Sequence, residues 1–156
     1  MTKAKDDKRR MRSAARLYAV QALFQMEASD SDLDKVREEF ETHRFGAVVD
    51  DEEWPEGNVD LFRQLLYLAV SEQAKIDQMT DRALVAKWPI ERIDPTLRAL
   101  FRTAGAELLD RGTPVKVVIS EFVEVAKAFF PDGREPGFVN AVLDHMAREA
   151  RPAEFA

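Results

Sequence analysis

The sequence predicts an all-α protein, and three observations support this prediction. Apolar residues recur at helical spacing along most of the chain, whereas no strand-like alternation persists over a useful length. Proline and glycine residues fall where helices would begin and end. The 156 residues, 46% of them hydrophobic, suffice for a buried core. We expect one compact domain of six or seven helices over residues 13–150, with a flexible basic arm (residues 1–12) before it and a short C-terminal tail (residues 151–156) after it.

The first third of the chain is expected to contain two helices and a loop. Ser13 is a suitable N-cap for a helix that continues to about residue 28. A second helix is predicted from about Ser31 to Arg44, because apolar residues follow at i, i+3, i+7 spacing. The segment GAVVDDEEWPEG, residues 46–57, has a glycine near each end, a proline and four consecutive acids, and it predicts a loop.

The middle of the chain predicts a long helical stretch with one interruption. Asn58 can cap a helix whose LFRQLLYLAV segment is apolar around most of its circumference, which indicates a central position. The helical pattern continues to about Lys87, and we expect a break in the polar segment SEQAK, residues 71–75. Trp88 precedes Pro89 and is therefore disfavoured in the helical region, so the element should end there.

Three further helices are marked by their ends. Asp94-Pro95 and Thr113-Pro114 are typical starts, Gly112 is expected to close the helix between them, and the last helix should begin near Gly137. Each has an apolar stripe that predicts its buried face. In chain order, the stripes consist of Leu97, Leu100, Phe101, Ala104 and Leu108 in the first helix, Val115, Val118, Ile119, Phe122, Ala126 and Phe129 in the second, and Val139, Val142, Leu143 and Met146 in the last.

Composition excludes several kinds of chemistry. The chain has no cysteine, which rules out disulfides, thiolate zinc sites and a cysteine nucleophile. His43 and His145 are far apart in sequence and match no metal motif, and the six glycines form no phosphate-binding pattern. The acidic run at residues 50–53 lacks the ligand spacing of a calcium loop. We therefore expect no metal, no cofactor and no enzymatic activity. Without a membrane-spanning segment or signal peptide, the chain is expected to be cytoplasmic.

The distribution of charge and aromatic residues indicates where a ligand would bind. The formal net charge is -6, yet the first 16 residues contain seven basic residues and only two acidic ones. Such a basic segment is either a solubilising tail or a contact for phosphates. Phe24 and Phe138 are candidates for stacking on unpaired bases. Core packing is the alternative for both, and it is stronger for Phe24, which shares core spacing with Leu17 and Val20.

Three segments together resemble a known family. RSAARLYAVQALFQ near the start, TPVKVVISEFVEVAKAFF and above all GFVNAVLD are similar to the bacterial NusB transcription antitermination factors. The resemblance covers nearly the whole chain in the right order. It implies an all-helical fold of two small packed bundles. It also implies binding to boxA, a short and largely unpaired RNA element, together with NusE, a ribosomal protein, in the antitermination complex on RNA polymerase.

The resemblance also implies site residues. The arginine-rich motif falls on Arg9, Arg10, Arg12 and Arg16, the aromatic after VQAL is Phe24 where the family usually has tyrosine, and FVNAVLD supplies Phe138 and Asn140. The chain departs from the family at Ser120, because members often have asparagine in that position. Its REPG loop also differs from the charged or polar loop common in the family.

Two other functions stay open at this point. A similar domain forms part of certain RNA cytosine-5 methyltransferases, and the chain is a possible stand-alone relative of it, although those enzymes need a cysteine and a second domain. A helical adaptor that binds only proteins is the other alternative.

Overall fold

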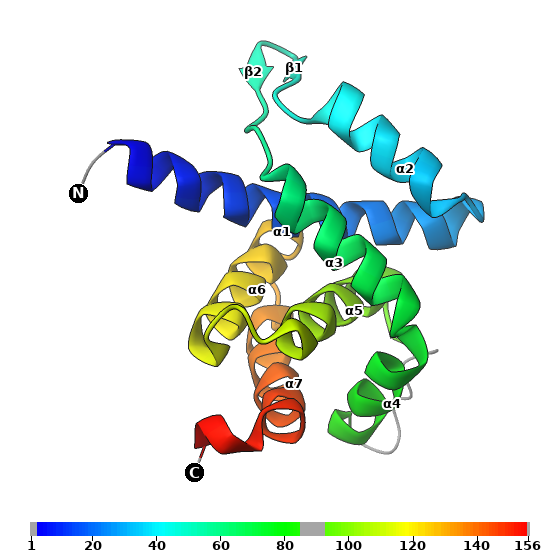
Figure 1. Cartoon of the computed structure of the whole chain (residues 1–156), viewed down its shortest axis with the longest axis vertical. Helices are drawn as coiled ribbons and strands as arrows, with labels where there is room; N and C mark the ends of the chain where they lie inside the picture. The colour runs from blue at the N-terminus through cyan, green and yellow to red at the C-terminus, as the bar shows by residue number, and fades with distance from the viewer. Residues whose placement is uncertain (1–2, 85–92, 156) are drawn as a thin grey trace. The chain divides into compact units, whose positions relative to one another are not determined.

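The computed structural model describes residues 3–84 and 93–155. The chain divides into two compact units, Met1–Tyr67 and Leu68–Ala156. Seven α-helices, α1 to α7, contain most of the described residues (Figure 1). The prediction of an all-α fold is confirmed, and the two units agree with the two bundles that the resemblance implies.

The first unit consists of helices around one small hairpin. Its elements are α1 (Lys3–Ser29), α2 (Leu33–Glu39), the π-helical turn η1 (Phe40–Arg44), β1 (Val48–Val49), β2 (Glu52–Glu53) and most of α3 (Val59–Ser71). The two strands are antiparallel and lie within the segment predicted as a loop. The tight connection between them requires left-handed backbone, which Asp50 and Asp51 adopt with φ of 52° and 64°.

The predicted N-cap of the first helix is wrong. α1 begins at Lys3, so Ser13 lies inside the helix and residues 3–12 form its first turns. The reason is local, because this segment is rich in good helix formers, and Asp6 and Arg10 have the i, i+4 spacing that supports a helix. The basic segment is therefore continuous with the rest of α1, while its mobility stays a prediction.

Aromatic rings form the core of the first unit. Tyr18 from α1 stacks on Phe45 with ring centroids 4.8 Å apart and meets the edge of Phe40 at 6.3 Å. Phe62 of α3 contacts Phe45 at 5.0 Å. Tyr18, Phe40 and Phe62 are almost completely buried. These rings join α1 and η1 to α3 and to the chain around the hairpin.

The second unit contains the remaining helices. They are the end of α3, α4 (Gln73–Ala83), α5 (Pro95–Asp110), α6 (Val115–Phe129), α7 (Glu135–Ala150) and the short 3-10 helix η3 (Pro152–Phe155). The predicted break in SEQAK is confirmed at Glu72, between α3 and α4. The predicted end at Trp88-Pro89 lies outside the described residues.

Most predicted helix ends in this unit are close to those observed. The Asp94 carboxylate accepts a hydrogen bond of 2.7 Å from the Thr96 N–H, which confirms the N-cap of α5. At the other end Arg111, rather than Gly112, adopts the left-handed conformation, with φ of 67°. α7 begins two residues before Gly137, because Pro136 fits the first turn of a helix.

The predicted stripes form the core of the second unit. All five positions of the α5 stripe and all four of the α7 stripe are buried, while Ile119 and Phe129 of α6 are half-buried. α4 and α5 approach closely at Gly105, where an added Cβ would lie 2.4 Å from a carbon of Ile76. The residues predicted as a tail are attached to this core, since Arg151 is only 4% exposed.

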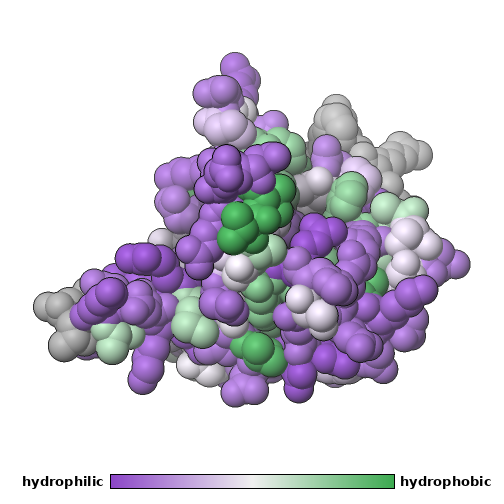
Figure 2. All heavy atoms as spheres, turned by 90° about the horizontal axis from the view of Figure 1, so that it is seen from above, coloured by the Kyte–Doolittle hydropathy of each residue, from purple (hydrophilic) through white to green (hydrophobic). Residues whose placement is uncertain are grey.

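The face seen in Figure 2 is mostly hydrophilic, with some hydrophobic side chains gathered near the middle of the view. Phe24 and Phe138 are among the few large hydrophobic residues that are exposed. Of the helices in the described part of the chain, none is both long and apolar enough to cross a membrane.

Candidate nucleic-acid interface

Three of the four predicted arginines share one face of α1. Arg9, Arg12 and Arg16 are spaced i, i+3, i+7, and at about 100° per residue they lie within one stripe. Lys5 belongs to the same stripe one turn earlier, which the sequence analysis did not point out although the spacing is visible there. The stripe is a row of positive charge along the first turns of the helix.

Exposure decreases along this stripe. Lys5 and Arg9 are exposed, Arg12 is half-buried, and Arg16 is only 2% exposed. A phosphate can therefore approach the stripe at Lys5 and Arg9, whereas the Arg16 side chain is not accessible in this structure. Sequence spacing placed Arg16 on the same face of the helix as Arg9 and Arg12, but it carried no information on the burial of Arg16.

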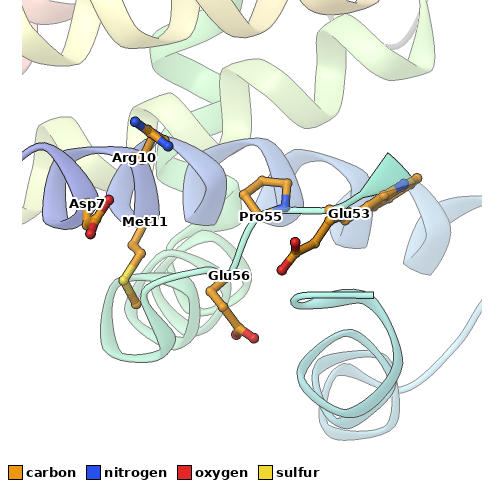
Figure 3. Close-up of a pocket in the computed structure, with 7 residues that line it drawn as sticks. Asp7, Arg10, Met11, Glu53, Pro55 and Glu56 are labelled. Atoms are coloured by element: carbon orange, nitrogen blue, oxygen red, sulfur yellow. The ribbon is translucent and has the colours of Figure 1, made fainter. Parts of the chain in front are cut away.

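The fourth predicted arginine has different surroundings. Arg10 is about 100° from Arg9 around the helix and borders a hollow of about 450 Å³ in the first unit. The other labelled residues of this hollow in Figure 3 are Asp7, Met11, Glu53, Pro55 and Glu56. Three of these residues, Asp7, Glu53 and Glu56, are acidic. Their negative potential opposes the approach of a phosphate to Arg10.

The chain that borders this hollow is fixed to α1. The Tyr18 hydroxyl donates a 2.7 Å hydrogen bond to the Pro55 carbonyl, and the Asn58 N–H donates one of 2.9 Å to the Met11 carbonyl. Burial raises the pKa of Tyr18, and the negative charge of Glu56 raises this pKa further. The Tyr18 phenol therefore stays protonated and able to donate this bond at neutral pH.

Phe24 is on the surface, although its spacing favoured the core. Its side chain is 38% exposed, while Val20 and Leu23 in the turn before it are buried. It lies eight residues after Arg16, which corresponds to about 12 Å along the helix axis. The first unit therefore presents a basic stripe and an accessible ring on the same helix.

In the second unit, Phe138 is anchored at one edge and open elsewhere. It is 36% exposed, and its ring centroid lies 6.1 Å from that of the buried Phe101, with the planes at 67°. This edge-to-face contact fixes the orientation of the ring while leaving part of it accessible. Such a ring is suited to stacking on an unpaired base.

Asn140 is exposed but does not share the face of Phe138. The buried Val139 lies between them, and two residues of helix separate their directions by about 200°. Phe138 lies at the edge of α7 that contacts α5, while Asn140 borders a groove along α6. The structure therefore separates two residues that the sequence placed in one motif.

The described residues contain no group of three or more histidine, cysteine or acidic side chains arranged to hold a metal ion. Features with the chemistry of a ligand site include the basic stripe, the two exposed rings and the groove beside Asn140. They suit the binding of a polyanion with unpaired bases.

Comparisons with known proteins agree with this fold. Residues 13–148 match the model of the NusB family. The chain is 48% identical over 151 residues to the transcription antitermination protein NusB of Maricaulis maris, with 96% of this chain and 94% of that relative covered. It is 47% identical over 141 residues to the protein of the same name from Caulobacter vibrioides, with 90% and 94% covered.

Solved structures show the same fold. A structure of T. maritima NusB superposes with a TM-score of 0.73 at 29% identity, covering 92% of this chain and 95% of that one. NusB in a crystal structure of NusB and NusE with double-stranded RNA superposes with a TM-score of 0.71 at 23% identity, covering 90% and 98%. The family model spans most of the chain and the relatives exceed 40% identity, so this chain belongs to the NusB family.

Proposed function

We propose that this protein is a transcription antitermination factor that binds boxA-type single-stranded RNA together with NusE. In this role it would join the antitermination complex on RNA polymerase in the cytoplasm and support transcription through ribosomal RNA operons. The curated relatives carry the name of transcription antitermination proteins, and one structural neighbour was crystallised with NusE and RNA. It would act by binding, not as an enzyme.

The observation that carries the proposal is the pairing of positive charge with exposed aromatic rings. Lys5 and Arg9 offer accessible charge for the RNA backbone, and Arg12 extends the stripe. Phe24 and Phe138 offer exposed ring surface on which unpaired bases can stack. Charge without rings would suit any polyanion, whereas the combination favours a strand with unpaired bases.

The sequence preference and the effect on transcription test this proposal together. The protein should bind a boxA-type strand more tightly than a scrambled strand of equal length and composition, measured by fluorescence anisotropy at several salt concentrations. In a purified transcription reaction with NusE, it should increase read-through of a terminator only when the transcript contains the boxA element. Equal binding of both strands and no boxA-dependent read-through would refute the proposal.

A further inference from the structure

A groove runs between α6 and α7 in the second unit, and the sequence analysis did not assign it. Its volume is about 480 Å³, and Asn140 is the lining residue from α7. The other lining residues lie on one face of α6 at helical spacing, and they are Lys116, Ile119, Ser120, Val123, Glu124 and Lys127. From Lys116 to Lys127 this row of α6 residues rises about 16 Å along the helix axis. It is long enough for more than one nucleotide.

The charges of the groove favour an anion at both of its ends. Lys116 is exposed at the start of α6, and Lys127 lies at the other end of the row of α6 residues that line the groove. Lys127 forms an ion pair of 3.0 Å with Glu124, but both side chains are more than half exposed. Such a surface pair is weak because water screens it, so a phosphate can replace Glu124 as the partner of Lys127.

The middle of the groove combines apolar and polar groups. Ile119 and Val123 are half-buried and form an apolar surface against which a ribose or a base can pack. Ser120 and Asn140 are exposed beside them and offer hydrogen bonds to a base edge or to a 2′-hydroxyl. The groove thus has the separate partners that one nucleotide requires, namely charge for its phosphate and polar groups for its sugar or base.

We propose that the α6–α7 groove is a second RNA subsite, which holds nucleotides that flank the one stacked on Phe138. This inference rests on the proposed RNA binding and extends it. Asn140 lies about 200° from Phe138 around α7, so a single nucleotide cannot contact both residues from one side. A strand that passes the first turn of α7 reaches both edges, with Lys116 and Lys127 binding its backbone in the groove.

The length of the RNA separates the two subsites experimentally. Three RNAs are titrated with the parent protein, namely a boxA core strand and the same strand extended by four nucleotides at its 5′ or its 3′ end. The parent should bind one extended strand more tightly than the core. Lys116→Ala and Lys127→Ala should each weaken that extended strand by about fivefold at 0.1 M salt, and each should lower the salt slope by roughly 0.7. Both variants should bind the core strand like the parent.

Two further variants provide the matched comparisons. Glu124→Gln removes the negative charge from the groove and should tighten binding of the extended strand, the opposite sign to the lysine variants. Lys75→Ala removes an exposed lysine of α4 that does not line the groove, and it should change neither affinity. Circular dichroism melts of all variants confirm that they fold like the parent, because every substituted side chain is exposed.

The possible failures are distinguishable. If the lysine variants bind every strand like the parent while Phe138→Ala still weakens the core strand, the groove subsite is refuted and the proposed function stands. If Lys116→Ala reduces affinity for NusE but not for RNA, the groove belongs to a protein partner and the subsite is again refuted. If neither Phe138→Ala nor the arginine variants weaken the core strand, the proposed function itself fails.

Discussion

Phe138 illustrates how one contact can orient a candidate binding residue. Its ring meets Phe101 edge-on, so the protein orients it, yet more than a third of the residue is exposed. A ring buried on all sides would contribute only to the core, and a ring free on all sides would lose rotamer freedom on binding. Phe138 lies between these cases, which suits a preorganised stacking surface.

Replacing Phe138 distinguishes stacking from core packing. Phe138→Ala should reduce the free energy of unfolding by about 1 kcal/mol, since it removes a partly exposed edge contact. RNA affinity should fall by about 1–3 kcal/mol in the folded protein. Phe122→Ala, at a fully buried position, should instead cost about 3–5 kcal/mol of stability. Urea unfolding and RNA titration measure both quantities, and a folded Phe138→Ala protein that binds RNA like the parent would contradict the stacking role.

Arg151 has a structural role that its sequence position concealed. Its guanidinium donates to the backbone carbonyls of Glu107, Leu108 and Thr113 at 2.5 to 2.8 Å, and so satisfies groups at the end of α5 that have no partner within the helix. It also pairs with Glu154 at 3.2 Å. A residue predicted to belong to a tail therefore connects η3 and α7 to α5.

Removal of Arg151 should therefore destabilise the second unit. Arg151→Ala leaves buried carbonyls without donors, and each such group costs about 1–3 kcal/mol. Arg151→Lys should recover only part of the loss, because an ammonium cannot reproduce the planar fork of donors. Arg148→Ala, at an exposed arginine of α7 that pairs with Asp144 and lies over the Phe155 ring, is the control and should change stability much less. Thermal unfolding measures all three, and a wild-type melting temperature for Arg151→Ala would contradict this role.

At the scale of the element, α1 combines two surroundings on one helix. Lys5, Arg9, Arg12 and Arg16 form the stripe, whereas Arg10 borders the hollow that Asp7, Glu53 and Glu56 also line. Helical geometry thus divides the arginine-rich motif into a stripe suited to phosphates and Arg10, which borders a hollow with acidic residues. The two parts should contribute unequally to RNA binding.

Salt dependence tests this division. Replacing both Arg9 and Arg12 with alanine should reduce the slope of log affinity against log salt. The expected reduction is roughly 0.7 for each lost phosphate contact. Arg10→Ala should change this slope less, because the carboxylates of Asp7, Glu53 and Glu56 already oppose a phosphate there. Lys35→Ala, an exposed lysine of α2, controls for net charge. Equal slopes for the Arg10 and the Arg9/Arg12 variants would reject the division.

The first turns of α1 should be the least stable part of that helix. Residues 3–10 have no buried side chain, whereas the helix from Ala14 to Leu23 is mostly buried. Amide hydrogen exchange should therefore be fast in the first turns and slow around Tyr18, and RNA should slow the exchange in the first turns. Uniform protection along α1 without RNA would contradict the predicted flexible arm.

At the scale of the whole molecule, the proposed function needs a partner. If RNA and NusE bind to one surface formed by both proteins, each must strengthen the binding of the other by the same factor. We expect NusE to tighten boxA binding by about 5–150-fold, the usual range of such coupling. Titrating RNA with and without NusE, and NusE with and without RNA, measures the factor twice. Identical RNA affinities with and without NusE would exclude the heterodimer as the binding unit.

Much of the architecture was determined by local sequence signals. The Asp94-Pro95 start, the break near Glu72 and the buried faces of α5 and α7 were all predicted, because capping chemistry and helical spacing act within a few residues. The errors were also local. The start of α1 was misplaced because a suitable cap at Ser13 was preferred over the helix-forming segment before it.

The candidate site required the tertiary structure. Helical spacing alone favoured a core position for Phe24, whereas the structure leaves it exposed. The spacing also gave no sign that Arg16 is buried or that Arg10 borders a hollow lined by three acids. The exposure and the electrostatic environment of a side chain depend on which residues distant in sequence pack against it. Helical periodicity carries no information on such contacts. The sequence by itself determined which residues are candidates for RNA binding, and only the folded chain decided which of these candidates a ligand can reach.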